Sequence, residues 1–485
     1  MIAAGVESMR HATRWSTGSW ACRGSYMSFL EDCLLQLARG LEGKKTVIIG
    51  YRLDACESIA ETIRNFTGEP PFVLARGSGS RLPPRTPDFG LHVIPISAAD
   101  YATEVRLYEA TLSNLPSNAL DALQDYDPAG EALVLGRASA PLDSVAGRRA
   151  FAPTRDEWVA LEDKGVVDAF WDRVGIGHAP SEVIPSMESA RLLQASKMLR
   201  SSLGVIWSGD ASKGPNSGAE LIRWVRSEEH AHEAMAFFRT RCNAVRVMPF
   251  LRGTPCAVHG IVFDHGTAAF RPVETMTGHR PGTTRLYYCG TATFWLPSQL
   301  AMKRVRTTVR RVGEYLRQSL DYRGGFSIDG VMVGDTFMPT EINTRFTGGH
   351  ERLAMSCPEL PLELLNAAAI ARQQLSIEID ELETYVIEAA NRNPTGSVYF
   401  SSKTCVTNTS FYETECGTMS LGPSVTGGGF ARLDLDPTAF HLGESVAAQA
   451  FRALRAKLAT LGVNDADYVA IVDCFSGPDR HADGV

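Results

Sequence analysis

The sequence predicts an α/β protein with an N-terminal parallel-sheet domain followed by mixed α+β subdomains. Two patterns in the 485-residue chain indicate this class. Short apolar strand patterns alternate with a helical pattern from residue 46 to 96, the rhythm of a parallel sheet. Two β-branched runs, 326–333 and 337–343, flank Gly334-Asp335-Thr336 and indicate an antiparallel hairpin. A hydrophobic content of 44% is enough for about three cores in a chain of this length.

The first 150 residues divide into an extension and a small α/β domain. Residues 1–42 begin without clear periodicity and end in an apolar helical stripe from 29 to 41. Residues 43–150 form the α/β domain. Its expected elements are strand 46–50, helix 56–66, strand 71–75, strand 92–96 and strand 132–135. Gly50-Tyr51-Arg52 does not fit G-x-G-x-x-G, so a dinucleotide site is poorly supported.

The rest of the chain is expected to form subdomains at 151–250, 251–375 and 376–485. Residues 376–485 are expected to close over the active site. The expected helices are 165–174, 186–203, 228–240, 297–320, 361–373 and 444–461. The expected strands outside the hairpin are 204–207, 221–225, 256–264, 268–274, 385–389, 396–400 and 468–472.

Composition excludes several classes of function. The net charge of −7 argues against nucleic acid as a partner, which would need a basic surface. We find no apolar run long enough to cross a membrane, and charges interrupt the start of the chain where a signal peptide needs an apolar core. The ten cysteines are scattered, without metal-ligand spacing. We therefore expect a cytoplasmic protein with reduced thiols and no membrane partner.

Chemistry-bearing residues concentrate in the hairpin. Side chains alternate along a strand, so Glu341 and Asn343 share one face, and Arg345 stays on it if the extended backbone continues. Asp329 joins them only if it lies opposite Glu341, which requires an odd loop length, such as three residues, or a β-bulge. Carboxylate and amide oxygens suit Mg²⁺, which usually shares its coordination with substrate phosphates.

The alternative for these residues is a half-buried hairpin with a hydrated polar face. For any single residue that alternative would be the better one. It is weaker for the whole set, because acids gathered on one face repel each other unless a cation compensates them.

The stretch D-G-V-M-V-G-D-T-F-M-P-T-E-I-N-T-R resembles the metal-binding end of the ATP-grasp ligases. The resemblance implies that Asp329, Glu341 and Asn343 hold Mg-ATP. It also implies that Arg345 stabilises an acyl-phosphate and the tetrahedral intermediate. The leading α/β domain would correspond to the pre-ATP-grasp domain of that superfamily.

The same resemblance implies nucleotide contacts earlier in the chain. Lys164 matches a lysine that reaches the phosphates, although a solvated surface charge is the alternative for a single lysine. Lys213 lies in a small-residue loop that suits a phosphate lid or a plain surface loop. The hinge residues Met248, Phe250 and Leu251 would hold adenine.

The chain departs from the family at two points. Many relatives carry a lysine on the strand before the lid loop, where this chain has Ile206-Trp207-Ser208. Many also have an acid in or after the hinge for adenine or ribose, and no acid lies between Glu233 and Asp264. The departures weaken the Lys213 and ribose assignments.

The substrate side is expected between the hinge and the hairpin. Glu274 would aim at the cleft and, with His350, could assist proton transfer. The loop G-H-R-P-G-T-T-R carries cations suited to a carboxylate, Arg285 among them, with a surface loop as the alternative. The expected substrate-binding residues are Arg271, Arg285, Gly348 and Gly349.

Together these features predict an ATP-dependent carboxylate–amine ligase that uses Mg²⁺. The closest resemblance is to peptide ligases of antibiotic biosynthesis with an extra leading domain, such as the pheganomycin type. It implies a small, amino-acid-like carboxylate as acyl donor and an amine or peptide as nucleophile, and leaves homodimer formation open. The alternatives are an ATP-grasp carboxylase, a thioester-forming synthetase and a catalytically silent ATP-binding regulator.

Overall fold

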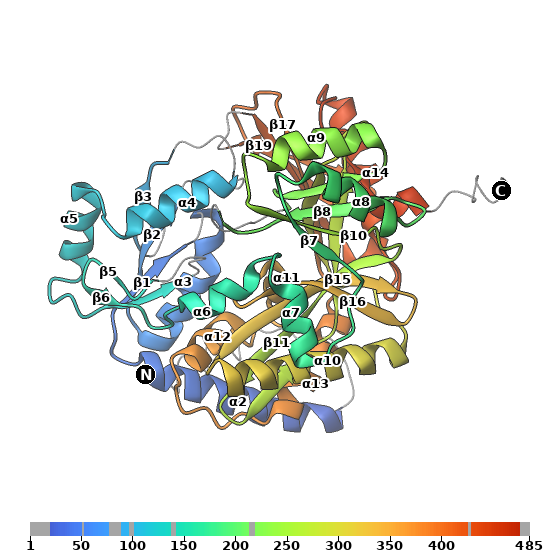
Figure 1. Cartoon of the computed structure of the whole chain (residues 1–485). Coiled ribbons are helices and arrows are strands. Elements are labelled where there is room, and N and C mark those ends of the chain that lie inside the picture. Colours follow the sequence, from blue (N-terminus) through green and yellow to red (C-terminus); the bar gives the residue numbers. More distant parts are fainter. Residues whose placement is uncertain are drawn as a thin grey trace.

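The computed structural model describes residues 20–50, 53–76, 89–96, 101–136, 142–212, 219–424 and 428–475. It contains a parallel N-terminal sheet, a four-stranded antiparallel sheet and an 11-stranded sheet, with helices packed around them (Figure 1). The predicted α/β class, a parallel-sheet domain followed by mixed subdomains, is confirmed.

The N-terminal sheet has the order β3-β2-β1-β4, and its strand pairs are parallel. All four residues of its central strand β1 are buried, as expected for an apolar strand covered on both faces. Its elements are β1 (Thr46–Ile49), α3 (Leu53–Thr67), β2 (Phe72–Arg76), β3 (Gly90–Ile94), α4 (Tyr101–Leu112), α5 (Ser117–Tyr126) and β4 (Leu133–Gly136).

The second sheet has the order β7-β10-β8-β9 and is antiparallel. Side chains alternate across it. Val205, Trp207 and Val245 point into its core, so Ser208 and Arg246, which are cross-strand partners, share the opposite face. The elements here are α6 (Asp156–Val159), α7 (Val167–Val174), β7 (Glu182–Pro185), α8 (Ser189–Met198), β8 (Val205–Gly209), β9 (Ile222–Val225), α9 (Glu228–Phe238) and β10 (Ala244–Pro249).

The large sheet follows the path β16-β15-β11-β13-β14-β17-β20-β19-β18, and β12 and β21 pair at its sides. Its strands are β11 (Thr254–Phe263), β12 (Gly266–Ala269), β13 (Val273–His279), β14 (Leu286–Ala292), β15 (Gly324–Val333), β16 (Thr336–Asn343), β17 (Gly396–Ser402), β18 (Ser410–Thr414), β19 (Gly417–Pro423), β20 (Gly429–Leu435) and β21 (Val469–Ala470). Because β14 pairs with β17, the sheet runs across residue 375, where we predicted a boundary.

Helices from the N-terminal, central and C-terminal parts of the chain cover the large sheet. In Figure 1, α2, α10, α12 and α13 lie along its lower side and α14 covers its upper right part. Their bounds are α2 (Trp20–Leu41), α10 (Gln299–Ser319), α11 (Gly348–Ser356), α12 (Leu362–Ile370), α13 (Ile379–Arg392) and α14 (Ala447–Thr460). Among the described helices, none is both apolar enough and long enough for a membrane crossing.

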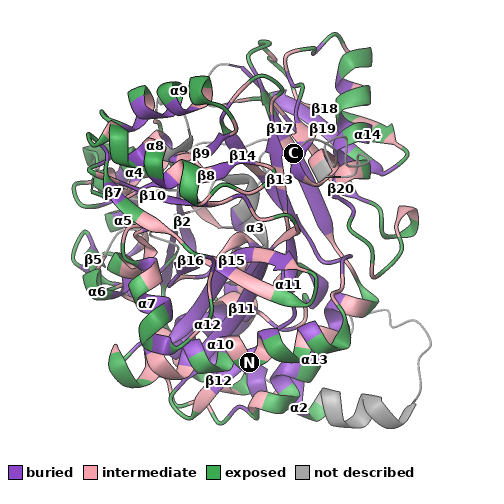
Figure 2. Ribbon diagram, turned by 45° about the vertical axis from the view of Figure 1, so that its right-hand side comes forward, coloured by how far each residue is buried: buried purple, intermediate pink, exposed green. Residues whose placement is uncertain are grey.

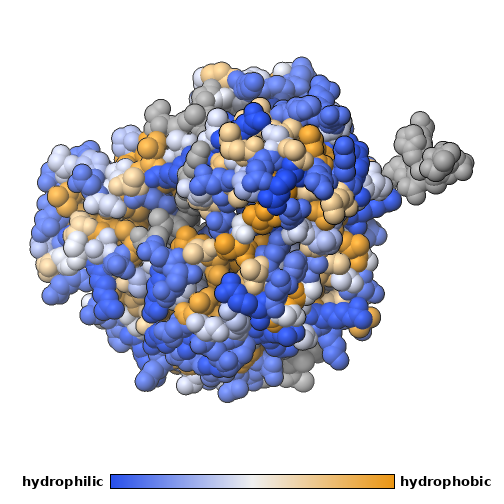
Figure 3. All heavy atoms as spheres, in the orientation of Figure 1, coloured by the Kyte–Doolittle hydropathy of each residue, from blue (hydrophilic) through white to orange (hydrophobic). Residues whose placement is uncertain are grey.

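Burial follows these layers. Figure 2 shows buried strands at the centre and helices whose exposed faces point outward. On the face in Figure 3, hydrophilic side chains cover most of the surface, and hydrophobic ones gather toward its middle. The apolar periodicity of the sequence therefore translates into a shared interior between the sheets and their helices.

One predicted element is wrong. We expected a strand at 385–389, and the structure has helix α13 there. Its buried residues Leu382, Tyr385, Val386 and Ala389 recur at spacings of three and one, a helical stripe. The run Tyr-Val-Ile within it has strand propensity, but packing of the stripe under the sheet decides the conformation.

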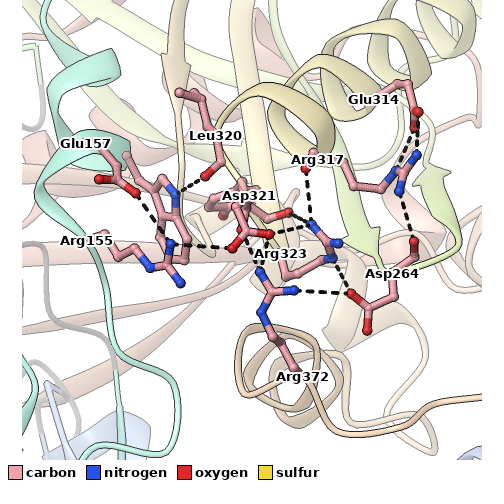
Figure 4. A network of polar contacts seen from close by, with 11 residues as sticks. Arg155, Glu157, Asp264, Glu314, Arg317, Leu320, Asp321, Arg323 and Arg372 are labelled. Atoms are coloured by element: carbon pink, nitrogen blue, oxygen red, sulfur yellow. Dashed lines mark hydrogen bonds and ion pairs between the residues drawn. The ribbon is translucent and has the colours of Figure 1, made fainter.

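An exposed polar network fixes the chain on its way into β15 (Figure 4). The carboxylate of Asp321 pairs with Arg372 Nη2 at 2.5 Å and with Arg155 Nη1 at 3.6 Å. The neighbouring Arg323 donates through Nε to Asp264 at 2.6 Å. Single exposed ion pairs add little stability, but a network joining four segments restrains the strand that carries Asp329.

A buried acid secures α13 to the sheet. Glu383 is fully buried, accepts from Ala269 N–H at 2.7 Å and pairs with Arg306 and Arg310. We expect Glu383→Ala to lower the free energy of unfolding by about 3 kcal/mol, because it removes the acid that Arg306 and Arg310 share and leaves the buried Ala269 N–H without its acceptor. Glu381→Ala on an exposed position of the same helix is the control. Equal urea midpoints for the two variants would contradict this role.

Candidate active site

The hairpin β15–β16 brings the predicted metal ligands together. Val333 pairs with Thr336, so the turn has two residues, not the three expected. The register then shifts between Asp329 and Gly330, and Thr340 is the extra residue of a β-bulge. Asp329 therefore lies opposite Glu341, by the second of the two routes considered from the sequence. Thr340 stabilises the bulge by donating its hydroxyl to the Asp329 carbonyl at 3.1 Å.

Hydrogen bonds join these side chains into one cluster. Asn343 donates through Nδ2 to Asp329 Oδ2 at 3.3 Å and accepts from Arg345 Nη2 at 2.9 Å. Lys164, from the segment before α7, pairs with Glu341 Oε1 at 2.9 Å. Five residues from three segments of the chain thus meet at the edge of the large sheet.

Glu162 completes the cluster and was missed from the sequence. Its carboxylate accepts from Thr344 N–H at 3.0 Å and from Arg345 Nε at 3.1 Å. Glu162 accordingly raises the pKa of Arg345 and fixes the direction of its guanidinium. Its position two residues before Lys164 was the available signal, because both approach the hairpin from the same short segment.

The electrostatics of the cluster suit a divalent cation. Burial and then the neighbouring Glu341 carboxylate raise the pKa of Asp329 to about 7, against the opposing effects of Arg345 and Lys164. The carboxylates are therefore incompletely compensated by protein cations. Among the described residues, no three acids, histidines or cysteines are grouped so that they could hold a metal ion by themselves. Two carboxylates and an amide oxygen leave the remaining coordination positions to water or phosphate, which fits Mg²⁺.

The cluster opens into a cavity of about 1520 Å³. Three parts of the structure line it: the carboxyl ends of β1 and β2, the polar face of the second sheet, and one face of the large sheet. The predicted site residues on its wall are Lys164, Met248, Phe250, Leu251, Arg285, Asp329, Glu341, Asn343, Arg345, Gly348 and Gly349. Lys213 lies outside the described residues.

The hinge forms an apolar corner of this cavity. Phe250 packs on Trp224 with ring centroids 4.8 Å apart, and Met248, two residues before Phe250, is buried. The Phe250 N–H donates to the Gly204 carbonyl at 3.0 Å, and Pro249 has no N–H. The edge of a planar ligand bound in this corner would therefore contact the backbone of Leu251.

Where relatives are expected to carry a strand lysine, the chain places an arginine from the adjacent strand. Arg246 lies opposite Ser208, and both residues line the cavity. Its guanidinium binds both carboxylate oxygens of Asp168, at 2.7 and 2.6 Å, and is almost fully buried. Asp168 therefore holds a cation at a fixed position on the wall.

Three predicted site residues have structural partners and do not line the cavity. Arg271 is fully buried and donates to the carbonyls of Thr293 and Trp295 at 2.8 and 2.7 Å. Glu274 accepts from Ser445 and from Val446 N–H, at the start of α14. His350 accepts from Thr347 N–H at 3.1 Å, which caps α11, and its Nε2 lies 3.3 Å from the Gly260 carbonyl. The structure thus does not bring these three to the cluster.

The comparisons with known proteins bear on the fold. No protein-family model matches the sequence, and a comparison with curated proteins finds no match. The solved phosphoribosylamine–glycine ligase of Thermotoga maritima is similar, with a TM-score of 0.53, 13% identity, and coverage of 88% of this chain and 99% of that one. So is biotin carboxylase of Campylobacter jejuni, with a TM-score of 0.53, 11% identity, and coverage of 91% and 97%. These likenesses show that the chain has the ATP-grasp fold.

A buried histidine beneath the cluster yields a pH prediction. His259 is fully buried, next to His350 at a ring-centroid distance of 4.7 Å. Burial, and then His350, lower the pKa of His259 well below its usual range. A histidine with a depressed pKa contributes stability above the unfolded pKa of about 6.5, and the contribution falls as pH decreases. Wild-type protein should lose up to about 1.4 kcal/mol per pH unit below pH 6.5 from this residue.

His259→Leu removes that proton-linked loss. We therefore expect its urea midpoint to fall less than the wild-type midpoint between pH 7 and pH 5. His232→Leu, at an exposed position of α9, is the matched control and should follow the wild type. Parallel curves for wild type and His259→Leu would show that the buried imidazole is not held neutral.

Proposed function

We infer that the protein is an ATP-dependent carboxylate–amine ligase that forms an amide through an acyl-phosphate. The observation that carries this is the convergence of Asp329, Glu341, Asn343, Arg345 and Lys164 on the wall of one large cavity. This set supplies oxygen ligands for a metal ion, a lysine that would bind phosphate, and a guanidinium that would stabilise the negative charge of the transition state. The ATP-grasp fold supports the assignment.

Asp329, Glu341 and Asn343 would hold Mg²⁺. Bound there, the ion would neutralise phosphate charge and withdraw electrons from the transferred phosphoryl group. Lys164 already contacts Glu341 and would turn toward the phosphates when the acids gain a metal. The solved ATP-grasp structures include a carboxyaminoimidazole ribonucleotide synthase complexed with ATP and a biotin carboxylase domain complexed with MgADP.

The adenine base and the phosphates of ATP would bind against the polar face of the second sheet. The apolar corner of Met248 and Phe250 would cover adenine, and Leu251 would supply the backbone contact. Arg246 would face the phosphates from the position opposite Ser208, in place of the strand lysine. The pairing with Asp168 fixes the position of the Arg246 guanidinium and lowers the net charge of the pair. Arg246 would therefore orient the phosphates more than attract them.

The reaction has two balanced steps. A carboxylate oxygen forms a bond to the γ-phosphorus as the bond from that phosphorus to the β,γ-bridging oxygen breaks, which yields acyl-phosphate and ADP. The nitrogen of a neutral amine then bonds to the acyl carbon, and the bond from that carbon to the phosphate oxygen breaks. The products are an amide, inorganic phosphate and one proton. Arg345, held by Glu162, would stabilise the negative charge on the reacting oxygens.

The finer assignment is a peptide ligase that joins an amino-acid-like carboxylate to an amine or a peptide. A cavity of about 1520 Å³ exceeds the volume of typical small-molecule sites and leaves room for ATP together with two further substrates. The second candidate is a carboxylase, favoured by the match of nearly the whole chain to biotin carboxylase. ATP turnover that requires bicarbonate would identify it.

Nucleotide release tests the proposal and the metal site together. Purified protein with Mg-ATP is incubated with amino acids or small carboxylates, in pairs with short peptides or other amines. We expect ADP and phosphate only when both partners are present, and Glu341→Gln should abolish this release while leaving the unfolding midpoint close to wild type. Release of AMP and pyrophosphate would refute the acyl-phosphate route. Full activity in Glu341→Gln would remove the metal assignment.

Arg345 is predicted to act mainly on the rate. Replacing a group that stabilises transition-state charge typically lowers turnover by about 10²–10³. We expect Arg345→Met to lower kcat by this amount with little change in the KM for ATP. Arg455→Met, at an exposed position of α14, should match wild type. Unchanged kcat, or a loss seen only in KM, would refute the assignment.

A further inference from the structure

A buried cation lies in the cavity away from the metal cluster. Arg352, on α11, is 7% exposed and lines the cavity wall. It donates through Nη2 to Ser397 Oγ at 2.5 Å and through Nε to Thr291 Oγ1 at 3.4 Å. Both partners are neutral hydroxyls, and no carboxylate of the described residues lies within ion-pair distance of its guanidinium. Burying a charge without a counter-ion is costly, so this arrangement favours a ligand that brings the negative charge.

A second guanidinium reinforces the same region. Arg432 of β20 lines the cavity, and its side chain is 19% exposed. Burial and then Arg432 lower the pKa of Arg352 to about 10. Arg432 pairs with Asp434 at 2.7 Å, whereas the partners of Arg352 are uncharged: the two hydroxyls and the sulfur of Met355, which accepts from its Nη1 at 3.6 Å. The excess positive charge therefore resides on Arg352.

The surroundings provide further donors. The first turn of α11 contains Gly348 and Gly349, both on the cavity wall. A Cβ placed on Gly348 would lie 2.8 Å from the hydroxyl of Tyr288, so this hydroxyl lies against the helix start. Helix starts attract anions through their unpaired N–H groups. Gly348 follows Arg345 by three residues, so this region borders the metal cluster.

One wall of the region is aromatic. Tyr399 lies between Tyr288 and Phe430, with ring-centroid distances of 5.9 and 5.5 Å. These rings line the cavity on the same side as Arg432, because Tyr399 and Arg432 are cross-strand partners. The pocket thus combines a charged end with an apolar wall.

We propose that Arg352, with Arg432 and the Tyr288 hydroxyl, binds the carboxylate of the acyl donor, and that Tyr399 and Phe430 contact an apolar or aromatic side chain of this donor. This inference rests on the proposed ligase function and names the substrate class of its site. The carboxylate would then lie beside the metal cluster, where its oxygen can reach a γ-phosphoryl group. Arg352 is a positioning residue in this scheme, and Arg345 stabilises the reacting oxygens.

Ligand-observed NMR with the full chain, ADP and Mg²⁺ tests the pocket apart from catalysis. The probes are N-acetyl amino acids, which offer a carboxylate and no amine, and the matching N-acetyl amino acid amides, which lack the charge. We expect carboxylates with apolar or aromatic side chains to bind and their amides not to bind. Arg352→Met should weaken this binding about tenfold or more, and Arg352→Lys should restore part of it. Arg455→Met is the control.

Tyr288→Phe keeps the ring and removes only the hydroxyl, so it serves if Arg352→Met fails to fold. We expect this variant to bind the same carboxylates more weakly while its binding of ADP stays unchanged. The proposal is overturned if no carboxylate of the panel binds, if amides bind equally well, or if neither variant weakens binding. It is also overturned if the variants weaken the binding of inorganic phosphate or ADP instead, because the pocket would then be a phosphate site.

The outcomes separate this inference from the ligase proposal. Carboxylate binding that depends on Arg352, without ATP turnover for any amine, would support the pocket and refute the ligase. Turnover with unchanged KM for the acyl donor in Arg352→Met would support the ligase and refute the pocket.

Discussion

The pairing of Asp329 with Glu341 is the constraint on which the site depends. Side chains alternate along a strand, so a slip of one residue would carry one carboxylate to the opposite face. The bulge at Thr340 sets the register on the open side of the hairpin, and Ile328 and Ile342 hold it from the core side. Because β16 is the edge strand, its outer side is free to receive the segment that carries Glu162 and Lys164.

In the large sheet, the same alternation of side chains positions residues over a longer distance. One face of β14, β17 and β20 turns Tyr288, Ser397 and Arg432 to the cavity, while alternate residues such as Val398 and Leu433 pack toward α14. Two chemically different regions, the metal cluster and the Arg352 pocket, therefore stand on one continuous β scaffold. Sites on regular elements are positioned more rigidly than sites on loops, which suits a reaction that must align three substrates.

The hairpin and its ligands could be predicted because their geometry is local. Alternation alone places Glu341, Asn343 and Arg345 together, but the turn could hold two or three residues, so the bulge remained undecided. The ATP-grasp fold was reached through the resemblance of this same stretch and is confirmed.

The residues that sequence reasoning misplaced or missed depend on distant partners. Arg271 is an arginine before a proline, and nothing nearby shows that two carbonyls more than twenty residues away consume its donors. Arg352 was missed for a similar reason, since its hydroxyl partners lie 61 and 45 positions away. A charged residue becomes informative only once the sheet shows which groups surround it.

The two regions also carry opposite charge imbalances. At the hairpin, three acids meet two cations: Glu162, Asp329 and Glu341 against Lys164 and Arg345. At α11, Arg352 has no acid within ion-pair distance among the described side chains. Each imbalance is costly in a buried setting, and a cation at the first and an anion at the second would relieve both. Because Gly348 follows Arg345 by only three residues, ligands at the two regions should influence each other's affinity, and any such coupling must be reciprocal. Asp329 and Arg352 line the same cavity, so a cation and an anion bound in it would each meet the opposite charge on the wall.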